Sequence, residues 1–181
     1  FSYVAGYMFL RYLAKQAASS VIINKKNNAS VTGTAQADTI ENYGANFTIN
    51  AGEGADSISN ISNKVLISAS AGNDSIYNWS DGGAYSTLFG GAGNDTIKNW
   101  QNGKNVSING GTGNDYIENN YASGATITGG KGNDSLQNNS GTNVLFKYAS
   151  GDGFDLIGGF NATSTIQCGG DANVSLQTSG K

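Results

Sequence analysis

The sequence predicts an all-β protein, a right-handed parallel β-solenoid (a β-roll or β-helix) of about seven coils. Three observations support this fold class. A ten-residue phrase recurs as GGAGNDTIKN from Gly90, GGTGNDYIEN from Gly110 and GGKGNDSLQN from Gly129. Apolar residues recur at fixed offsets from the aspartate of that phrase. The chain has 27 glycines and no proline, which suits short strands joined by tight turns.

The aspartate of the phrase marks the period of the repeat. Seven aspartates occupy this place: Asp38, Asp56, Asp74, Asp95, Asp115, Asp134 and Asp155. By subtraction, the intervals between them are 18, 18, 21, 20, 19 and 21 residues. One coil of this length cannot bury its own apolar stripe, so we expect stability to come from the stacking of neighbouring coils.

Four columns of residues keep a fixed offset from the turn aspartate. Two residues after it stands an apolar residue: Ile40, Ile58, Ile76, Ile97, Ile117 and Leu136. Four residues after it stands an asparagine: Asn42, Asn60, Asn78, Asn99, Asn119 and Asn138. Seven residues before it stand Val31, Ile49, Ile67, Leu88, Ile108, Ile127 and, in the seventh copy, Tyr148. Nine residues before it stand Ala29, Phe47, Val65, Ser86, Val106, Ala125 and Phe146.

These columns predict the path of one coil. Apolar residues at alternate positions on both sides of a Gly-Asn-Asp turn indicate two short strands, each with one inward face. Strands of one type follow each other in the same direction, so we expect them to stack as parallel ladders about 4.8 Å apart. The asparagine column predicts amide ladders from coil to coil. A row of asparagines that binds sugar is the alternative.

The repeated phrase resembles the nonapeptide of hemolysin-type calcium-binding (RTX) repeat proteins, a β-helix calcium signature. Degenerate copies stand in register as GTAQAD from Gly33, AGEGAD from Ala51, ASAGND from Ala69 and SGDGFD from Ser150. The resemblance covers residues 29–160 and implies a calcium-binding β-roll. Family rolls commonly carry the nonapeptide on both edges, whereas here it recurs once per coil. We therefore expect calcium along one edge only.

The acidic turns also suit calcium on chemical grounds. Ca²⁺ takes six to eight oxygen ligands and accepts backbone carbonyls readily. Glycines five, four and two residues before the aspartate allow the backbone to turn its carbonyls to one side. Stacked carboxylates about 5 Å apart repel each other unless a positive charge lies between them. A simple type I′ hairpin turn would account for one copy of the phrase but not for the set.

We expect one turn to provide carbonyls and the next coil to provide its carboxylate, so that several calcium ions lie between coils along one edge. The resemblance implies the same arrangement. The best sites are expected between successive turns from Asp74 to Asp155. The candidate ligand residues are Asp74, Gly91, Gly93, Asp95, Gly111, Gly113, Asp115, Gly130, Gly132, Asp134, Gly151, Gly153 and Asp155. The turn at Asp38 has Ala35 and Gln36 in place of glycines, which predicts a poor ligand set.

Three regions follow from this pattern. Residues 1–28 are expected to form a helix from about Tyr3 to Ala18 and an initial strand; the helix is either a cap or the remnant of an upstream domain. Residues 29–160 form the calcium-binding solenoid. Residues 161–181 are expected to hold strands at Thr163–Cys168 and Asn173–Thr178, a cap whose exposed last edge suggests truncation.

Composition excludes several functions. The net charge of −3 offers no basic surface for nucleic acid. With no histidine, a Ser-His or Cys-His nucleophile and a His-based zinc site are absent, so we expect no catalysis by this stretch. A single cysteine excludes an internal disulfide. The apolar run at the N-terminus is interrupted by Arg11 and Lys15 and is too short for a transmembrane segment.

The sequence therefore predicts a calcium-binding repeat module of a larger secreted or surface-exposed bacterial protein, one that folds on calcium binding to support secretion and stability. Two alternatives remain open. Trp79, Trp100 and Tyr121 stand next to the asparagine column and could form an adhesive or carbohydrate-binding surface for a cell-surface glycan or protein. The chain could also be the C-terminal tail of a secreted hydrolase or peptidase.

Overall fold

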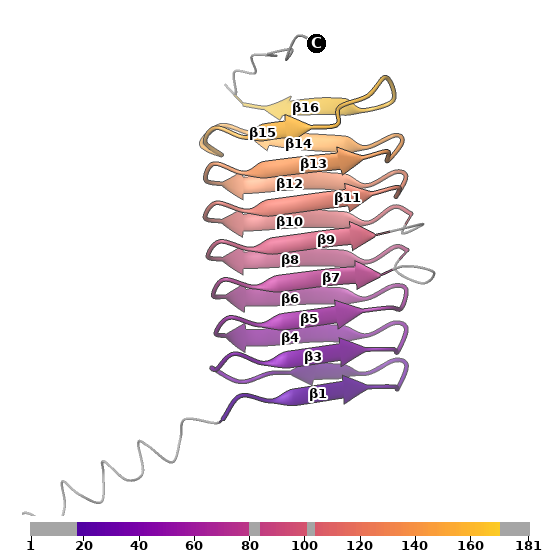
Figure 1. Cartoon of the computed structure of the whole chain (residues 1–181), viewed down its shortest axis with the longest axis vertical. Coiled ribbons are helices and arrows are strands. Elements are labelled where there is room, and N and C mark those ends of the chain that lie inside the picture. The colour runs from indigo at the N-terminus through magenta and orange to yellow at the C-terminus, as the bar shows by residue number, and fades with distance from the viewer. Residues whose placement is uncertain (1–17, 80–83, 101–103, 171–181) are drawn as a thin grey trace, which may run out of the picture.

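The structure is a computed structural model that describes residues 18–79, 84–100 and 104–170. In these residues sixteen strands form two sheets of eight, and every pair of neighbouring strands is parallel. The chain passes from one sheet to the other at each connection, so it winds upward as a ladder of coils (Figure 1). This arrangement confirms the predicted parallel β-solenoid of about seven coils.

The odd-numbered strands form the first sheet. They are β1 (Val21–Asn24), β3 (Thr39–Asn42), β5 (Ser57–Asn60), β7 (Ser75–Trp79), β9 (Thr96–Trp100), β11 (Tyr116–Asn120), β13 (Ser135–Asn139) and β15 (Leu156–Gly158). The even-numbered strands form the second sheet. They are β2 (Ser30–Thr32), β4 (Thr48–Glu53), β6 (Leu66–Ala71), β8 (Thr87–Ala92), β10 (Ser107–Thr112), β12 (Thr126–Lys131), β14 (Leu145–Ala149) and β16 (Thr165–Gly169).

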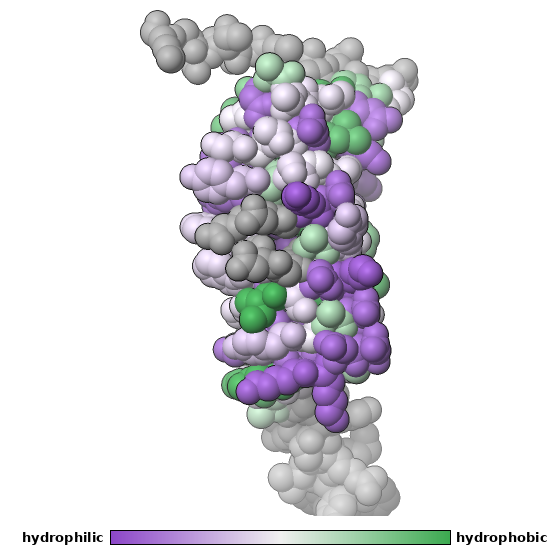
Figure 2. Space-filling model, turned by 90° about the vertical axis from the view of Figure 1, so that its right-hand side faces the viewer, coloured by the Kyte–Doolittle hydropathy of each residue, from purple (hydrophilic) through white to green (hydrophobic). Residues whose placement is uncertain are grey.

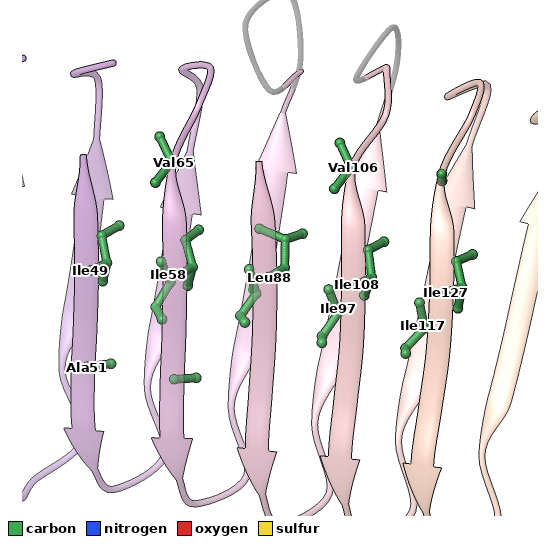
Figure 3. Packing of buried hydrophobic residues seen from close by; sticks show 14 of the residues in the cluster. Ile49, Ala51, Ile58, Val65, Leu88, Ile97, Val106, Ile108, Ile117 and Ile127 are labelled. Atoms are coloured by element: carbon green, nitrogen blue, oxygen red, sulfur yellow. The ribbon is translucent and has the colours of Figure 1, made fainter. Parts of the chain in front are cut away.

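The apolar columns meet between the two sheets, as the alternation predicts. Ile97 pairs with Ile117 in the first sheet, and Leu88 pairs with Ile108 in the second. All four side chains are at most 1% exposed. Figure 3 shows these side chains pointing from both layers of strands into the space between the sheets. Each coil thus adds one apolar residue to each layer and buries it against its neighbours.

The two edges of the solenoid have different connections. The acidic turns join each even-numbered strand to the next odd-numbered strand and lie on the left in Figure 1. The asparagine-containing loops lie on the opposite edge. The predicted separation of acidic turns and asparagine loops is therefore present.

The asparagine column forms a buried amide ladder at the loop edge. The Nδ2 of each asparagine donates to the Oδ1 of the asparagine one coil later, at 2.6 to 3.0 Å, along Asn24, Asn42, Asn60, Asn78, Asn99, Asn119 and Asn138. From Asn42 onward these residues are at most 1% exposed. The amide-ladder prediction is confirmed, and the alternative of a sugar-binding asparagine row is wrong because the row faces the interior.

The seventh coil has a different register from the one predicted. Phe146 pairs with Ile127, so it occupies the apolar column that was assigned to Tyr148. Val144, which is 1% exposed, takes the inner place assigned to Phe146. The 21-residue interval puts its additional residues between β14 and the turn, and a count back from Asp155 therefore misplaces both side chains by two positions.

Both predicted flanking strands that fall within the described residues are present. β1 pairs with β3 and β16 pairs with β14, so each extends a sheet. The predicted helix over Tyr3–Ala18 and the predicted strand over Asn173–Thr178 lie outside the described residues, apart from Ala18 itself. In the part of the chain that the structure describes, no helix is long and apolar enough to span a membrane.

Candidate metal centre

The turn aspartates form a continuous column in which each carboxylate reaches back by one coil. Oδ1 of Asp115 accepts a hydrogen bond from the backbone N–H of Asp95 at 2.8 Å, and Oδ1 of Asp95 accepts one from Asp74 at 2.8 Å. The same bond joins Asp38 to Asp56, Asp56 to Asp74, Asp115 to Asp134 and Asp134 to Asp155, at 2.7 to 3.0 Å. One oxygen of each carboxylate is thus used to hold neighbouring turns in register.

The second carboxylate oxygen is buried without a partner in five of these turns. The atoms are Oδ2 of Asp56, Asp74, Asp95, Asp115 and Asp134. Each of these residues is at most 2% exposed. A buried carboxylate oxygen with no hydrogen bond loses its hydration without a compensating interaction, which destabilises the charged form. The column therefore requires either a proton or a cation at each of these five turns.

Glycines leave room for this column. A Cβ on Gly90 would lie under 3.0 Å from Oδ2 of Asp95, so a side chain there would displace the carboxylate. Gly111 has a φ of +120°, and a Cβ on it would collide with the carbonyl oxygen of Gly91 in the coil below. The carbonyls of one turn thus point toward the next turn. Those of Gly93 and Gly113 accept no hydrogen bond from the described residues, which leaves them available as ligands.

The first turn satisfies its own aspartate. The first glycine that this turn lacks is replaced by Thr34 and not, as predicted, by Ala35, because Thr34 has the place of Gly91 in a later turn. The N–H of Thr34 donates to Oδ2 of Asp38 at 2.6 Å. The Thr34 hydroxyl donates to the same carboxylate at 3.0 Å, and the N–H of Ser20 donates to Oδ1. Asp38 therefore needs no cation, which agrees with the expectation of a poor ligand set there.

The pKa values of the column follow from this difference in partners. Burial raises the pKa of Asp115 to about 7, and the neighbouring carboxylates, Asp95 first among them, add to the shift. Burial likewise raises the pKa of Asp74 and of Asp155 to about 6. At Asp38 burial acts in the same direction, but the hydrogen bonds from Ser20 and Thr34 outweigh it and hold the pKa below its usual value.

The family comparison matches the region that holds the glycine-rich turns. The model of the RTX calcium-binding nonapeptide repeat (4 copies) matches residues 81–98, 102–119 and 126–146. The chain carries RTX calcium-binding repeats. The matched segments include the turns of Asp95, Asp115 and Asp134. Comparison with curated proteins gave no match, and comparison with solved structures gave none. The repeat region is thus a calcium-binding module, and Ca²⁺ is the metal of its family.

Most of the predicted ligand residues come together along the RTX turns. Gly91, Gly111 and Gly130 form one backbone ladder, and Gly93, Gly113, Gly132 and Gly153 form a second. The carbonyl of Gly153 already accepts a hydrogen bond from the hydroxyl of Tyr148. Gly151 stands apart, because no atom lies within 4 Å of where its Cβ would be. The longer connection after β14 displaces Gly151 from the place of Gly130 in the coil below.

Sequence reasoning missed one residue of the column. Asp56 has an unpartnered buried Oδ2 like those of the later turns. The glycines of its turn, Gly52 and Gly54, have φ values of +112° and +115°. The phrase AGEGAD keeps these two glycines and loses only the first, and this was the signal that could have identified the turn.

The glycine-rich turns of the aspartate column suit Ca²⁺ better than they suit a metal ion that is bound by side chains alone. No three His, Cys, Asp or Glu side chains converge as a ligand group among the described residues. Each gap between turns instead offers carboxylate oxygen together with backbone carbonyl oxygen. Hard oxygen ligands of low charge, with a large share of carbonyls, are the set that Ca²⁺ accepts.

Proposed function

We propose that this chain is a module of a larger secreted or surface-exposed bacterial protein, and that it folds when it binds calcium. Folding outside the cell then supports secretion and stability of the whole protein. The observation that carries the proposal is the column of five buried, unpartnered Oδ2 atoms. A stack that buries these charges has no stable metal-free form at neutral pH unless protons replace the metal.

The electrostatics of the column support this switch. Two carboxylates about 5 Å apart repel by roughly 3 kcal/mol at an effective dielectric constant of 20. Calcium, when bound, supplies positive charge between them. The aspartates then hold successive turns together, and the glycine-rich turns become ordered at an entropic cost. Because ions are shared between neighbouring turns, we expect cooperative binding with midpoints between micromolar and millimolar calcium.

Circular dichroism of the purified chain tests the proposal. In chelator we expect a largely disordered spectrum, and millimolar calcium should convert it to β-structure with a cooperative thermal transition. Calorimetry should show several ions bound per chain. An identical spectrum and melting temperature in both buffers, with no calcium bound, would leave a metal-independent solenoid and defeat the proposal.

A second candidate function is adhesion through aromatic residues near the loop edge. The rings of Tyr77 and Trp79 stack at a centroid distance of 6.1 Å, and Trp79 lies 5.4 Å from Trp100. Trp79 is 42% exposed and Tyr121 is 67% exposed. The loop edge in Figure 2 is mainly hydrophilic or neutral in colour, with isolated hydrophobic spots. Amphipathic rings in a polar surface suit contact with carbohydrate or protein.

A glycan array with the calcium-loaded chain tests this second candidate. We expect binding that Tyr121→Ala weakens, whereas Asn63→Ala, at an exposed loop position, leaves it unchanged. Absence of binding on the array and in pull-downs would eliminate the adhesive function. The third possibility is an upstream hydrolase or peptidase in the same polypeptide, and the sequence of the full-length protein tests it.

A further inference from the structure

A second ladder runs along the outside of the turn edge. We call it the turn-asparagine ladder; it consists of Asn73, Asn94, Asn114 and Asn133, each directly before a turn aspartate. The side-chain Oδ1 of each accepts a hydrogen bond from the backbone N–H at the same place one coil later. The donors are Asn94, Asn114, Asn133 and Phe154, at 2.7, 2.7, 2.8 and 3.0 Å. These asparagines are exposed, so burial does not account for them.

The two ladders at this edge point in opposite directions. The N–H of Asp74 points toward the following coil, where it meets Oδ1 of Asp95. The N–H of Asn94 points toward the preceding coil, where it meets Oδ1 of Asn73. Each gap between two turns therefore contains two backbone N–H donors. One belongs to the aspartate of the earlier turn, and the other belongs to the residue before the aspartate of the later turn. N–H groups that converge on a space favour anions, so both must be covered before a cation can enter.

The first two turns lack this cover. Ala37 and Ala55 stand where the next four turns have asparagine. The N–H of Ala55 and the N–H of Asn73 accordingly have no acceptor among the described residues. The gap between the turns of Asp56 and Asp74 thus has a buried carboxylate oxygen but also an uncovered donor. The four gaps from Asp74 to Asp155 have both donors covered.

We propose that the turn-asparagine ladder determines which gaps bind calcium tightly. The four gaps bridged by asparagine fill first, and the two gaps bounded by Ala37 and Ala55 bind weakly or remain without metal. This inference rests on the proposed calcium-dependent folding. The asparagines act as positioning residues, because their Oδ1 atoms are engaged by backbone N–H groups.

Calcium titration of the full chain tests the proposal, with calcium alone as the probe and both calorimetry and circular dichroism as readouts. Asn114→Ala should raise the calcium midpoint about three- to tenfold, the factor that one hydrogen bond of ordinary strength corresponds to. Asn114→Asp keeps an acceptor oxygen and should restore the midpoint. Asn63→Ala is the matched control, because Asn63 is exposed at the loop edge.

The gain variant Ala55→Asn makes the test decisive even if Asn114→Ala fails to fold. A new Oδ1 at this place can accept the N–H of Asn73, so calorimetry should show five tight sites per chain in place of four. A purely structural role would change the melting temperature and leave the number of tight sites unchanged. If the parent binds calcium but Ala55→Asn has the same number of tight sites as the parent, the turn-asparagine ladder does not determine which gaps bind calcium tightly. If the parent binds no calcium, the proposed function itself is wrong, and the inference falls with it.

Discussion

Single residues in the core carry the register of the stack. Ile97 and Ile117 are fully buried and face each other in adjacent coils. We expect Ile97→Asp or Ile117→Asp to abolish cooperative thermal unfolding in calcium, because a buried unpaired charge costs several kcal/mol and the whole domain is stable by about 5–15 kcal/mol. Ser107→Asp, at an exposed strand position, should melt like the parent. A cooperative transition at the parent temperature for either core variant would contradict the assigned register.

The aspartates of the column differ in their hydrogen-bond partners, so we expect their substitution to have different effects on calcium-dependent folding. Asp115 lies in the middle of the column with an unpartnered Oδ2, whereas Asp38 receives hydrogen bonds from Thr34 and Ser20. We expect Asp115→Ala to raise the calcium midpoint of folding at least about tenfold, since it removes a charged ligand. Asp38→Ala should leave that midpoint within about twofold of the parent and lower the melting temperature of the calcium-loaded form. Equal midpoints for the two variants, measured by circular dichroism, would remove the distinction between the turns.

Among the elements, the strands and the acidic turns were predictable because one coil follows another at a nearly constant interval. Each isoleucine column fixes the inward face of its strand, and a one-residue slip would expose all of its members. The glycine pairs of the later turns could be placed for the same reason. The amide ladder also followed from the sequence, because six asparagines at one offset from the turn aspartates have few other ways to satisfy buried amides.

The sequence failed to place those elements whose position in space does not follow from their spacing to the turn aspartate. In the seventh coil the additional residues lie between β14 and the turn, and only the strand pairing of Phe146 with Ile127 reveals this. The unpartnered Oδ2 of Asp56 depends on the depth of the carboxylate, which the phrase AGEGAD does not state. The turn-asparagine ladder depends on the direction of backbone N–H groups, and a residue count contains no such direction.

The buried amide ladder is an element whose removal can be predicted. Asn119 accepts from Asn99 at 2.9 Å and donates to Asn138 at 3.0 Å. Its Nδ2 also donates to the carbonyl of Ala122 at 3.0 Å. Asn119→Leu removes all three bonds and leaves unmatched donors and acceptors on its neighbours, so we expect a loss of about 2–5 kcal/mol in denaturant unfolding of the calcium-loaded chain. Asn63→Leu, at an exposed position of the loop edge, is the matched control. A loss no larger than that of the control would show that the ladder contributes no net stability.

On the scale of the whole molecule, the column should discriminate between divalent cations. Each gap combines carboxylate and carbonyl oxygens on glycine-rich turns, a flexible set that suits six to eight ligands. Magnesium prefers six close ligands in octahedral geometry and retains its waters. We therefore expect the magnesium midpoint of folding to exceed the calcium midpoint by on the order of tenfold or more. Coincident titration curves followed by circular dichroism would show that charge alone, and not ligand number, drives folding.

The whole column should also respond to protons when metal is withheld. The carboxyls of Asp74 and Asp155 have pKa values raised to about 6, and that of Asp115 is raised to about 7, from an ordinary value of 3.8. Burial raises the pKa of Asp56, Asp95 and Asp134 in the same direction. A carboxyl whose pKa is higher in the folded state binds its proton more tightly there. Its contribution to stability is therefore complete below pH 3.8 and is lost as the pH rises through about 6 to 7.

In calcium-free buffer we accordingly expect more β-structure and a higher melting temperature at about pH 5 than at about pH 8. Asp38 acts in the opposite sense because its pKa is lowered, but its effect is confined to pH values below 3.8. With calcium present the order should reverse, because protons compete with the metal for the same oxygens and the calcium midpoint rises on acidification. Asp115→Asn provides the control, since a neutral amide at that place should reduce the difference between the two pH values in the metal-free chain. A metal-free melting temperature that is equal at both pH values, or higher at pH 8, would show that the aspartates of the column are not buried as charges in the folded chain.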